Sequence, residues 1–455
     1  MKWIVYYTSL ILLLLYGCYK GNTKEDPVEI QTGTTEYPYL IKTKQDLIQM
    51  RESVNTNNVV YRNKAYKLMT DLDFAGEPDW IPIGDSVRND FQGIFDGNGK
   101  VIRNIKIGSE EIPVRIADAG LFGYVLGGEI KNLGVHWIRI NTSGDSHVGG
   151  IAGAETNSKI TNCFTTGSFS GSNVGGIVSW SSGTISDCYS TATISGYGNY
   201  NYSGGIVGYS SGTISGSYST GSISGAIVGG IAGSSSIGTI INCYSTGSVS
   251  GRITGGIAGS LGGTIINCYS TGNVSATGQF SSYAGGIASD KGSILNCYSS
   301  GDVSSTAFQL SKNPDGENAA YVGGILGGNS ILPCNFCFPT SIKFCLALNK
   351  NLTAFCAYNS SQAYAFRIFR YSNIESVVSN NFAFEAMIVR YGTSGTNLTT
   401  TTDFTDTKKH GSNLTVKPVD LLNGYVLANP TYKGISLYNW KVQAGINNGL
   451  PVYSK

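Results

Sequence analysis

The sequence predicts an all-β protein in which similar coils stack into a parallel β-solenoid, or β-helix. The segment from Gly238 to Gly251, GTIINCYSTGSVSG, recurs along the chain with its apolar positions retained. Copies are spaced by roughly 25–30 residues, which is typical of stacked repeat architectures. Within a copy the apolar residues lie in short β-branched segments bounded by Gly, Ser or Asn, as in strands between turns, and no helical spacing fits them.

Three apolar positions of each copy are expected to face the core. One is the Ile of Gly-Gly-Ile, the second precedes Asn-Cys-Tyr, and the third lies two positions after the Gly of Ser-Thr-Gly. The columns are Ile151, Ile177, Ile206, Ile231, Ile257, Ile287 and Ile325; Ile160, Ile185, Ile214, Ile240, Ile265 and Ile294; and Phe169, Ile194, Ile223, Val249, Val274 and Val303. One strand around each anchor predicts a triangular coil, with each strand pairing in parallel with its copy about 4.8 Å away.

Weaker copies extend the array beyond the clear ones, at Ile102–Ile105, Ile130–Leu133 and Val378–Phe382. Together they predict about ten coils, and we assign residues 111–389 to the repeat solenoid.

A column of cysteines accompanies the second anchor. It comprises Cys163, Cys188, Cys243, Cys268 and Cys297, and Cys345 also fits it. We interpret it as a column of buried thiols, because free cysteine packs as a small hydrophobic residue and Ser217 fills the position in one copy. The alternative is a ladder of disulfides or metal sites. The column contains no histidine and so does not resemble a zinc site.

Each cysteine is flanked by residues with distinct expected roles. The Asn before it (Asn162, Asn242, Asn267 and Asn296) is expected to stack its amide at a bend. The aromatic residue after it alternates to the other side of the strand, so we expect it to line the outside. That column is Phe164, Tyr189, Tyr218, Tyr244, Tyr269 and Tyr298.

The N-terminal residues 1–17 are predicted to be a secretory signal rather than part of the fold. The segment Leu15-Tyr16-Gly17-Cys18 resembles a bacterial lipobox, which implies cleavage before Cys18 and lipidation of that residue. A plain cleaved signal and an uncleaved span are the alternatives, although the apolar run from Ile4 to Leu15 is short for a span. Residues 18–36 would be the lipidated Cys and a flexible tether, with a lipid membrane as partner and the outer membrane or cell surface as location.

Two non-repeating segments flank the solenoid. Residues 37–110 are expected to form an N-terminal cap and the first coil, with a helix starting at the capping box Thr43–Asp46. Residues 390–455, which contain Trp440, are expected to cap the other end, because an uncovered solenoid end exposes unpaired strands.

Composition excludes several function classes. Charged residues make up 13% of the chain and the net charge is +2, whereas nucleic-acid binding needs a basic face. Between Gly149 and Ser300 the charged residues are Glu155, Lys159, Asp187, Arg252, Asp290 and Lys291, which do not cluster as catalytic acids and bases do. The sequence therefore predicts a non-catalytic protein without cofactor or metal. A surface of Ser, Thr, Asn, Gly and Tyr suits binding of a glycan or of a matrix or host surface protein.

Two alternatives remain open at this stage. One is a structural envelope spacer, which needs no ligand. The other is a carbohydrate-active enzyme with its site in the caps or insertions, such as the break between Ser304 and Tyr321 that contains Lys312, Asp315 and Glu317. The pair Cys334 and Cys337 leaves open a local disulfide, which an exported compartment permits.

The repeats resemble the GLUG motif family of bacterial surface proteins. The match is carried by Gly-Gly-Ile-Ala-Gly at Gly149, Gly229 and Gly255 and by Asn-Cys-Tyr-Ser-Thr-Gly at Asn242 and Asn267. The segments starting at Asp71 and Phe91 are similar to those that often precede such repeats. The resemblance implies a secreted or cell-surface role of the adhesin type. Some members are attached to IgA-type metalloproteases, but no zinc-protease motif is present in this sequence.

Overall fold

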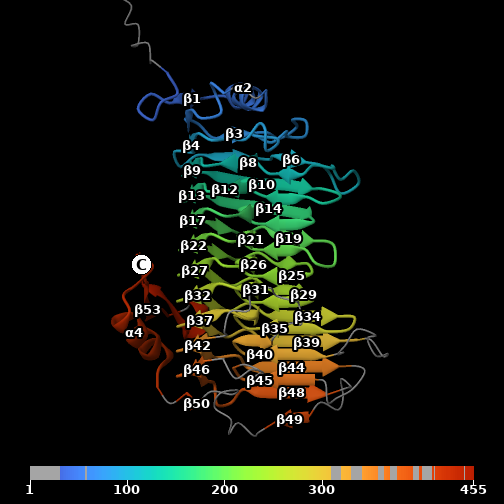
Figure 1. The fold of residues 1–455 in the computed structure, drawn as a ribbon, viewed down its shortest axis with the longest axis vertical. Coiled ribbons are helices and arrows are strands. Elements are labelled where there is room, and N and C mark those ends of the chain that lie inside the picture. The colour runs from blue at the N-terminus through green and yellow to red at the C-terminus, as the bar shows by residue number, and fades with distance from the viewer. Residues whose placement is uncertain are drawn as a thin grey trace, which may run out of the picture.

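A computed structural model shows a parallel β-solenoid whose coils stack along the long axis of the molecule (Figure 1), which confirms the predicted fold class. The structure describes residues 31–56, 59–308, 319–328, 341–356, 363–368, 377–392, 399–401, 412–414, 416–444 and 446–454.

The first sheet is a ladder of twelve parallel strands that contains the second anchor column. In order it comprises β1 (Tyr39–Ile41), β2 (Ala65–Leu68), β4 (Ile94–Asp96), β9 (Glu129–Lys131), β13 (Lys159–Thr161), β17 (Thr184–Ser186), β22 (Thr213–Ser215), β27 (Thr239–Ile241), β32 (Thr264–Ile266), β37 (Ser293–Leu295), β42 (Ser341–Lys343) and β46 (Val377–Ser379). The ladder exceeds the expected ten coils because the N-terminal segment contributes β1 and β2.

The second sheet contains two ladders side by side. The tyrosine ladder follows the aromatic column: β3 (Leu72–Asp73), β5 (Val101–Arg103), β18 (Tyr189–Ser190), β23 (Tyr218–Ser219), β28 (Tyr244–Ser245), β33 (Tyr269–Ser270), β38 (Tyr298–Ser299), β43 (Leu346–Ala347), β47 (Phe382–Ala383) and β50 (Ser412–Asn413). The serine ladder follows the third anchor: β6 (Lys106–Ile107), β19 (Thr193–Gly196), β24 (Ile223–Ser224), β29 (Val249–Gly251), β34 (Val274–Gly278), β39 (Val303–Ala307), β44 (Asn351–Cys356) and β48 (Ile388–Gly392). The longer strands β10 (Gly134–Asn141) and β14 (Phe164–Gly171) run through both ladders.

Two further ladders complete the coils. The third sheet comprises β7 (Asp118–Ala119), β11 (His147–Gly149), β15 (Asn173–Gly175), β20 (Tyr202–Gly204), β25 (Ile227–Gly229), β30 (Ile253–Gly255), β35 (Ser282–Gly285), β40 (Ala320–Gly323) and β45 (Ala363–Phe366). The fourth comprises β8 (Phe122–Leu126), β12 (Ala152–Thr156), β16 (Val178–Ser181), β21 (Val207–Ser210), β26 (Ala232–Ser235), β31 (Ala258–Leu261), β36 (Ala288–Asp290) and β41 (Leu326–Gly328).

The expected triangular coil of three strands is therefore wrong, since a coil such as β15 to β19 contains five short strands. The Gly-Gly of each Gly-Gly-Ile motif forms a corner that separates the third sheet from the fourth. At this corner a Cβ on Gly176 would lie 2.0 Å from the Gly205 carbonyl oxygen of the next coil, so successive coils approach too closely for any side chain. A similar close approach at Gly221 separates the tyrosine ladder from the serine ladder.

The predicted core columns are confirmed. The three anchor columns are buried throughout, with Ile177, Ile231 and Ile257 completely inaccessible to solvent. The cysteines of the column are all free and buried, as interpreted from the sequence, and their Sγ atoms lie near backbone carbonyl oxygens, as for Cys243 with the Ile241 oxygen at 3.2 Å. Burial raises the pKa of the Cys188 and Cys268 thiols, so they remain protonated.

The expected asparagine stack is also present at a bend. Asn242, Asn267 and Asn296 all have φ between 51° and 55°, in the left-handed region that Asn tolerates. The Nδ2 of Asn267 donates to Asn242 Oδ1 at 2.8 Å, and that of Asn296 donates to Asn267 Oδ1 at 2.8 Å. The bend therefore repeats in register from coil to coil.

The N-terminal segment covers one end of the solenoid. Helix α2 (Lys44–Asn55) begins at the predicted capping box, in which Thr43 accepts from the Asp46 N–H and Asp46 accepts from the Thr43 N–H at 2.8 Å. Its buried residues Leu47, Met50 and Val54 belong to the main hydrophobic core.

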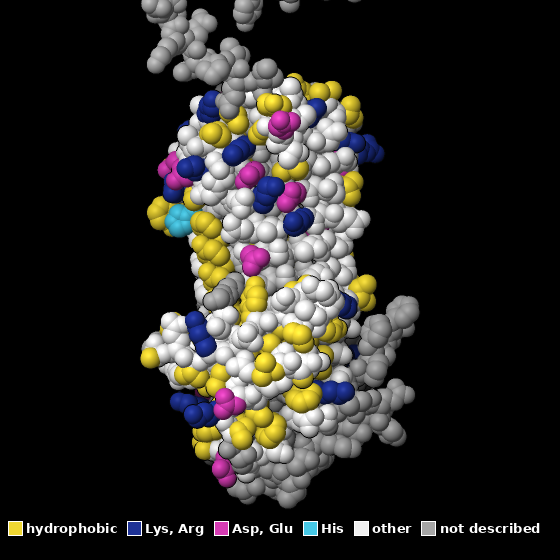
Figure 2. Space-filling view, turned by 90° about the vertical axis from the view of Figure 1, so that its left-hand side faces the viewer, with side chains coloured by type: hydrophobic (Ala, Val, Ile, Leu, Met, Phe, Trp, Pro, Cys, Tyr) yellow, Lys and Arg dark blue, Asp and Glu magenta, His cyan; other side chains and the backbone are white. Residues whose placement is uncertain are grey.

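We expected residues 390–455 to cap the opposite end, but the C-terminal segment, residues 416–454, lies on the side of the rod instead. Residues 416–454 form α4 (Pro418–Ala428), β51 (Thr431–Tyr432), β52 (Ile435–Ser436), β53 (Asn439–Val442), the short helix η2 (Asn447–Gly449) and β54 (Pro451–Ser454). They lie along the side of the rod, beside β32, β37 and β42 (Figure 1), on the side that faces the viewer in Figure 2. At the end of the array, β49 (Thr399–Thr401) pairs antiparallel with β48.

Specific contacts hold this segment against the bend. Trp440 Nε1 donates to Asn267 Oδ1 at 2.8 Å, and Asn267 Nδ2 donates to the Tyr438 carbonyl at 2.9 Å. Asn242 Nδ2 donates to the Ser436 carbonyl at 2.7 Å. The asparagine stack thus provides the amide groups that the segment needs, which explains why it docks on the side of the coils.

Neither α2 nor α4 is long and apolar enough to cross a membrane, and no other helix of the described residues is.

Candidate functional site

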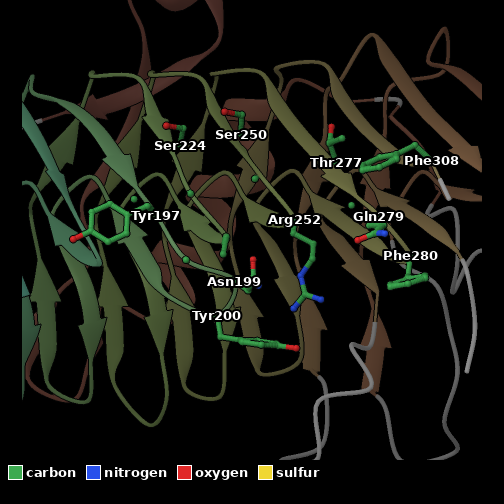
Figure 3. A pocket seen from close by; sticks show the side chains of 16 residues that line it. Tyr197, Asn199, Tyr200, Ser224, Ser250, Arg252, Thr277, Gln279, Phe280 and Phe308 are labelled. Carbon is green, nitrogen blue, oxygen red and sulfur yellow. The ribbon is translucent and has the colours of Figure 1, made fainter. Parts of the chain in front are cut away.

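A groove lies where the serine ladder connects to the third sheet, because the connecting loops differ in length (Figure 3). Gly229 follows Ile223 by six positions, and Gly255 follows Val249 by six. The loops on either side are longer: Gly204 follows Ile194 by ten positions, and Gly285 follows Val274 by eleven. Two short loops between two long ones leave a hollow with a volume of about 690 Å³.

The groove has a polar floor and aromatic walls. Ser224 and Ser250 of the serine ladder lie along it, and the first long loop contributes Tyr197, Asn199 and Tyr200. The other side is formed by Thr277, Gln279, Phe280 and Phe308. Tyr200 is 65% exposed and Phe308 52% exposed, which is unusual for large aromatic side chains in a folded protein.

Hydrogen bonds position the first long loop. Its Tyr197 hydroxyl donates to the carbonyl oxygens of Thr142 at 3.0 Å and Gly144 at 2.9 Å. Asn201 Nδ2 donates to Ser172 Oγ at 2.6 Å and to the Tyr197 carbonyl at 2.9 Å. The loop is therefore held in place before any ligand binds, which lowers the entropy cost of binding.

Arg252 extends from a short loop into the groove, where it is the one charged residue among the described residues that line it. Its backbone is fixed by hydrogen bonds to Ala226 and from Tyr283, at 3.0 and 3.1 Å. The guanidinium carbon lies 5.3 Å from the centre of the Tyr200 ring, which is a cation–π contact. No Asp or Glu among the described residues forms an ion pair with it, and its Nε is buried without a hydrogen-bond partner.

The groove has the chemistry of a binding site. Its lining residues provide hydroxyls, amides, aromatic rings and one cation, but no carboxylate, histidine or thiol. Hydroxyls, amides and aromatic rings suit stacking against a bound ligand and hydrogen bonding to it. Over the described part of the chain, no group of three or more His, Cys, Asp or Glu residues is arranged to hold a metal ion.

A second hollow of about 540 Å³ lies further along the serine ladder, lined by Glu110, Glu111 and Arg139 together with Ser168 and Ser170. Hydrogen bonds from its own backbone N–H and from Ser109 lower the pKa of Glu111, so this carboxylate remains ionised. A carbohydrate-active enzyme with its site in this hollow would need two carboxyl groups of different pKa on opposite sides of it.

The aromatic column does not offer a comparable site. From Phe164 to Tyr298 the ring centres are 4.7–5.1 Å apart and the rings are parallel to within 7°. Each ring face is covered by the next ring, so only the edges point outward. The expectation that the whole column lines the outside is wrong for Tyr269 and Tyr298, which are buried beneath the C-terminal segment.

The groove was not predicted from the sequence, although the uneven spacing between the third anchor and the next Gly-Gly could have located it. Cys18, the pair Cys334 and Cys337, and the alternative site with Lys312, Asp315 and Glu317 all lie outside the described residues.

Comparison with known proteins gives a match to the GLUG motif at residues 170–195, which confirms the resemblance seen in the repeats. Halomucin from Haloquadratum walsbyi is 31% identical over 191 residues, and the alignment covers 38% of this chain. The chain spans only 2% of the length of halomucin.

Two solved structures are similar along much of the chain. One is a Bacteroides ovatus protein with a proposed immunoglobulin A1 protease assignment, at 21% identity, a TM-score of 0.36, and 94% and 95% coverage of this chain and that one. The other is an IgA1 protease, at 14% identity, a TM-score of 0.38, and 81% and 22% coverage. At these TM-scores the likeness gives no basis for transferring an activity.

Proposed function

We propose that this protein is a lipid-anchored, cell-surface β-solenoid that binds glycans without catalysis, and so acts as an adhesin. The observation that carries the proposal is the groove, in which exposed aromatic rings flank hydroxyl and amide groups and the described lining residues include no carboxylate. Aromatic rings pack against the apolar faces of sugar rings, while hydroxyls and amides exchange hydrogen bonds with sugar hydroxyls. The GLUG motif fits a surface role.

The binding test uses the protein from residue 19 onward, which retains every residue that the structure describes. It should bind a subset of glycans on an array, and Tyr200→Ala or Phe308→Ala should weaken that binding by about tenfold or more. Tyr37→Ala is the matched control, because Tyr37 is 49% exposed and lies outside the groove. Binding to matrix proteins alone, with no glycan bound, would contradict the proposal.

The proposed location has its own test. Protease added to intact cells should degrade a surface protein but spare one that faces the periplasm. Labelled fatty acid should be incorporated into the wild type and lost in Cys18→Ala, together with signal cleavage. Cleavage elsewhere, or a wild type without fatty acid, would show that the chain is not anchored through Cys18.

A spacer without ligand is the second candidate. It predicts that the Tyr200 and Phe308 variants behave like wild type both on the array and in attachment of cells to surfaces. The carbohydrate-active enzyme predicts instead that a bound glycan is cleaved, which chromatography of the glycan after incubation would detect.

A further inference from the structure

We infer that the groove selects glycans that carry an anionic group, and that Arg252 is the residue that binds this group. The inference rests on the proposed glycan-binding function and adds the chemical class of the ligand. Its starting point is the charge distribution of the groove: within the part of the chain that the structure describes, Arg252 is the one charged side chain that lines it.

The Arg252 guanidinium has hydrogen-bonding capacity to spare. Its Nε is buried without a partner, and its contact with Tyr200 is to a ring face, which accepts no strong hydrogen bond. A buried donor left without a partner costs free energy, and a bound anion would remove that cost. The planar fork of arginine suits a carboxylate or sulfate in a bidentate arrangement.

The surroundings of Arg252 favour an anion that belongs to a sugar. Among the described residues, no carboxylate lines the groove to repel the ligand or to neutralise the arginine. Tyr200 fixes the guanidinium on one side, and Ser224 and Ser250 line the floor, where they can bond with sugar hydroxyls (Figure 3). An acidic peptide would match the charge but would leave this row of hydroxyls without the dense polar groups of a sugar.

The test compares matched glycans that differ in charge. Oligogalacturonate and its methyl ester differ in the carboxylate, and dextran sulfate and dextran differ in the sulfate. Calorimetry with the protein from residue 19 onward should show at least about tenfold tighter binding of one anionic member than of its neutral partner, with an affinity that falls as salt increases. Which pair shows the difference identifies carboxylate or sulfate as the preferred anion.

Two variants and a control assign the effect to Arg252. Arg252→Gln should lose about 10–100-fold in affinity for the anionic glycan, a much larger loss than for its neutral partner. Arg252→Lys, which keeps the charge without the fork, should recover part of the loss. Arg88→Gln removes an exposed arginine outside the groove and should have no effect. All variants should melt at the wild-type temperature.

The outcomes separate the two proposals. Equal binding of charged and neutral glycans, with no effect of Arg252→Gln, would overturn this inference and leave glycan binding intact. Absence of binding to any glycan would overturn the proposed function as well. Binding of polyglutamate through Arg252, with no glycan bound, would show that the anion site serves a protein partner and would overturn the glycan class.

Discussion

The repeated columns and the corner loops of this solenoid differ in how closely their copies agree. In the columns, Ile177, Ile206 and Ile231 occupy the same inaccessible position in successive coils. At the corner after the serine ladder, two short loops lie between two longer ones, and Tyr200 and Arg252 have no counterpart in the neighbouring coils. The difference separates the residues that make the fold from those that make the groove. Changes in the columns should therefore affect stability, and changes in the loops should affect binding.

The largest loss is expected from Ile257→Asp. This residue is completely buried in the middle of the stack, so the variant would place an unpaired charge in the core at a cost of several kcal/mol. We expect little or no soluble folded protein on expression. Ser248→Asp, at an exposed position of the preceding coil, is the control and should melt within a few degrees of the wild type. A folded Ile257→Asp protein with unchanged melting would mean that the column does not face inward.

The next largest loss of stability is expected in the part of the aromatic column that the C-terminal segment covers. Tyr298 is buried and its hydroxyl donates to the Pro451 carbonyl in the C-terminal segment, whereas Tyr189 is half-buried. Tyr298→Ala should cost about 3–5 kcal/mol in denaturant unfolding, as for other buried aromatic residues. Tyr189→Ala should cost about 1 kcal/mol. Equal losses at the two positions would argue that the C-terminal segment does not pack on the column.

A smaller cost is expected from Cys243→Ser, about 1 kcal/mol, because Ser217 already occupies the equivalent position one coil away. The thiols of the column are free, so a reductant should leave the melting temperature of the wild type unchanged. A reductant-sensitive transition that this substitution abolishes would reveal a disulfide in the column.

The smallest effect is a change in pH dependence at Glu155. Burial raises the pKa of this carboxyl above its ordinary value of 4.5, even though it accepts hydrogen bonds from Ser158 N at 3.1 Å and Gly183 N at 2.9 Å. The folded state therefore holds a proton that the unfolded state releases, so stability falls as pH rises from 4.5 through the raised folded pKa.

Glu155→Gln should remove that decline. The free energy of unfolding should be measured in urea from about pH 4 to about pH 8, and it should fall less in the variant than in the wild type. A wild-type stability that rises with pH over this range, with the variant flat, would mean that the folded protein stabilises the ionised form of Glu155.

The sequence predicted the columns because each copy repeats the same constraint. The buried isoleucines, the thiols and the asparagine bend were all readable from position alone. The docking of residues 416–454 on the side of the rod could not be predicted in this way. It depends on contacts such as that of Trp440 with Asn267, whose positions are far apart in the sequence and follow no repeat. The five-strand coil was also missed, because the close approach of backbones at Gly176 becomes evident only when coils are stacked.

The location of the groove could be predicted from the sequence, but the contacts among its residues could not. Loop lengths after the third anchor mark the corner where a hollow must form, since a short loop between long ones leaves space. They do not show that Tyr200 folds over Arg252, or that Tyr197 fixes its loop on the carbonyls of Thr142 and Gly144. These contacts join different coils, so no pattern within one copy specifies them.

Deletion of Tyr197–Tyr200 tests most directly the claim that the loops make the binding site and the columns make the fold. It shortens the long loop to the length of its neighbour, so that Gly204 would follow Ile194 by six positions, as Gly229 follows Ile223. Glycan-array binding and thermal melting should be measured on the same preparation. We predict a melting temperature within a few degrees of wild type and complete loss of array binding. Retained binding with normal melting would contradict the account, because the site would then lie elsewhere on the rod.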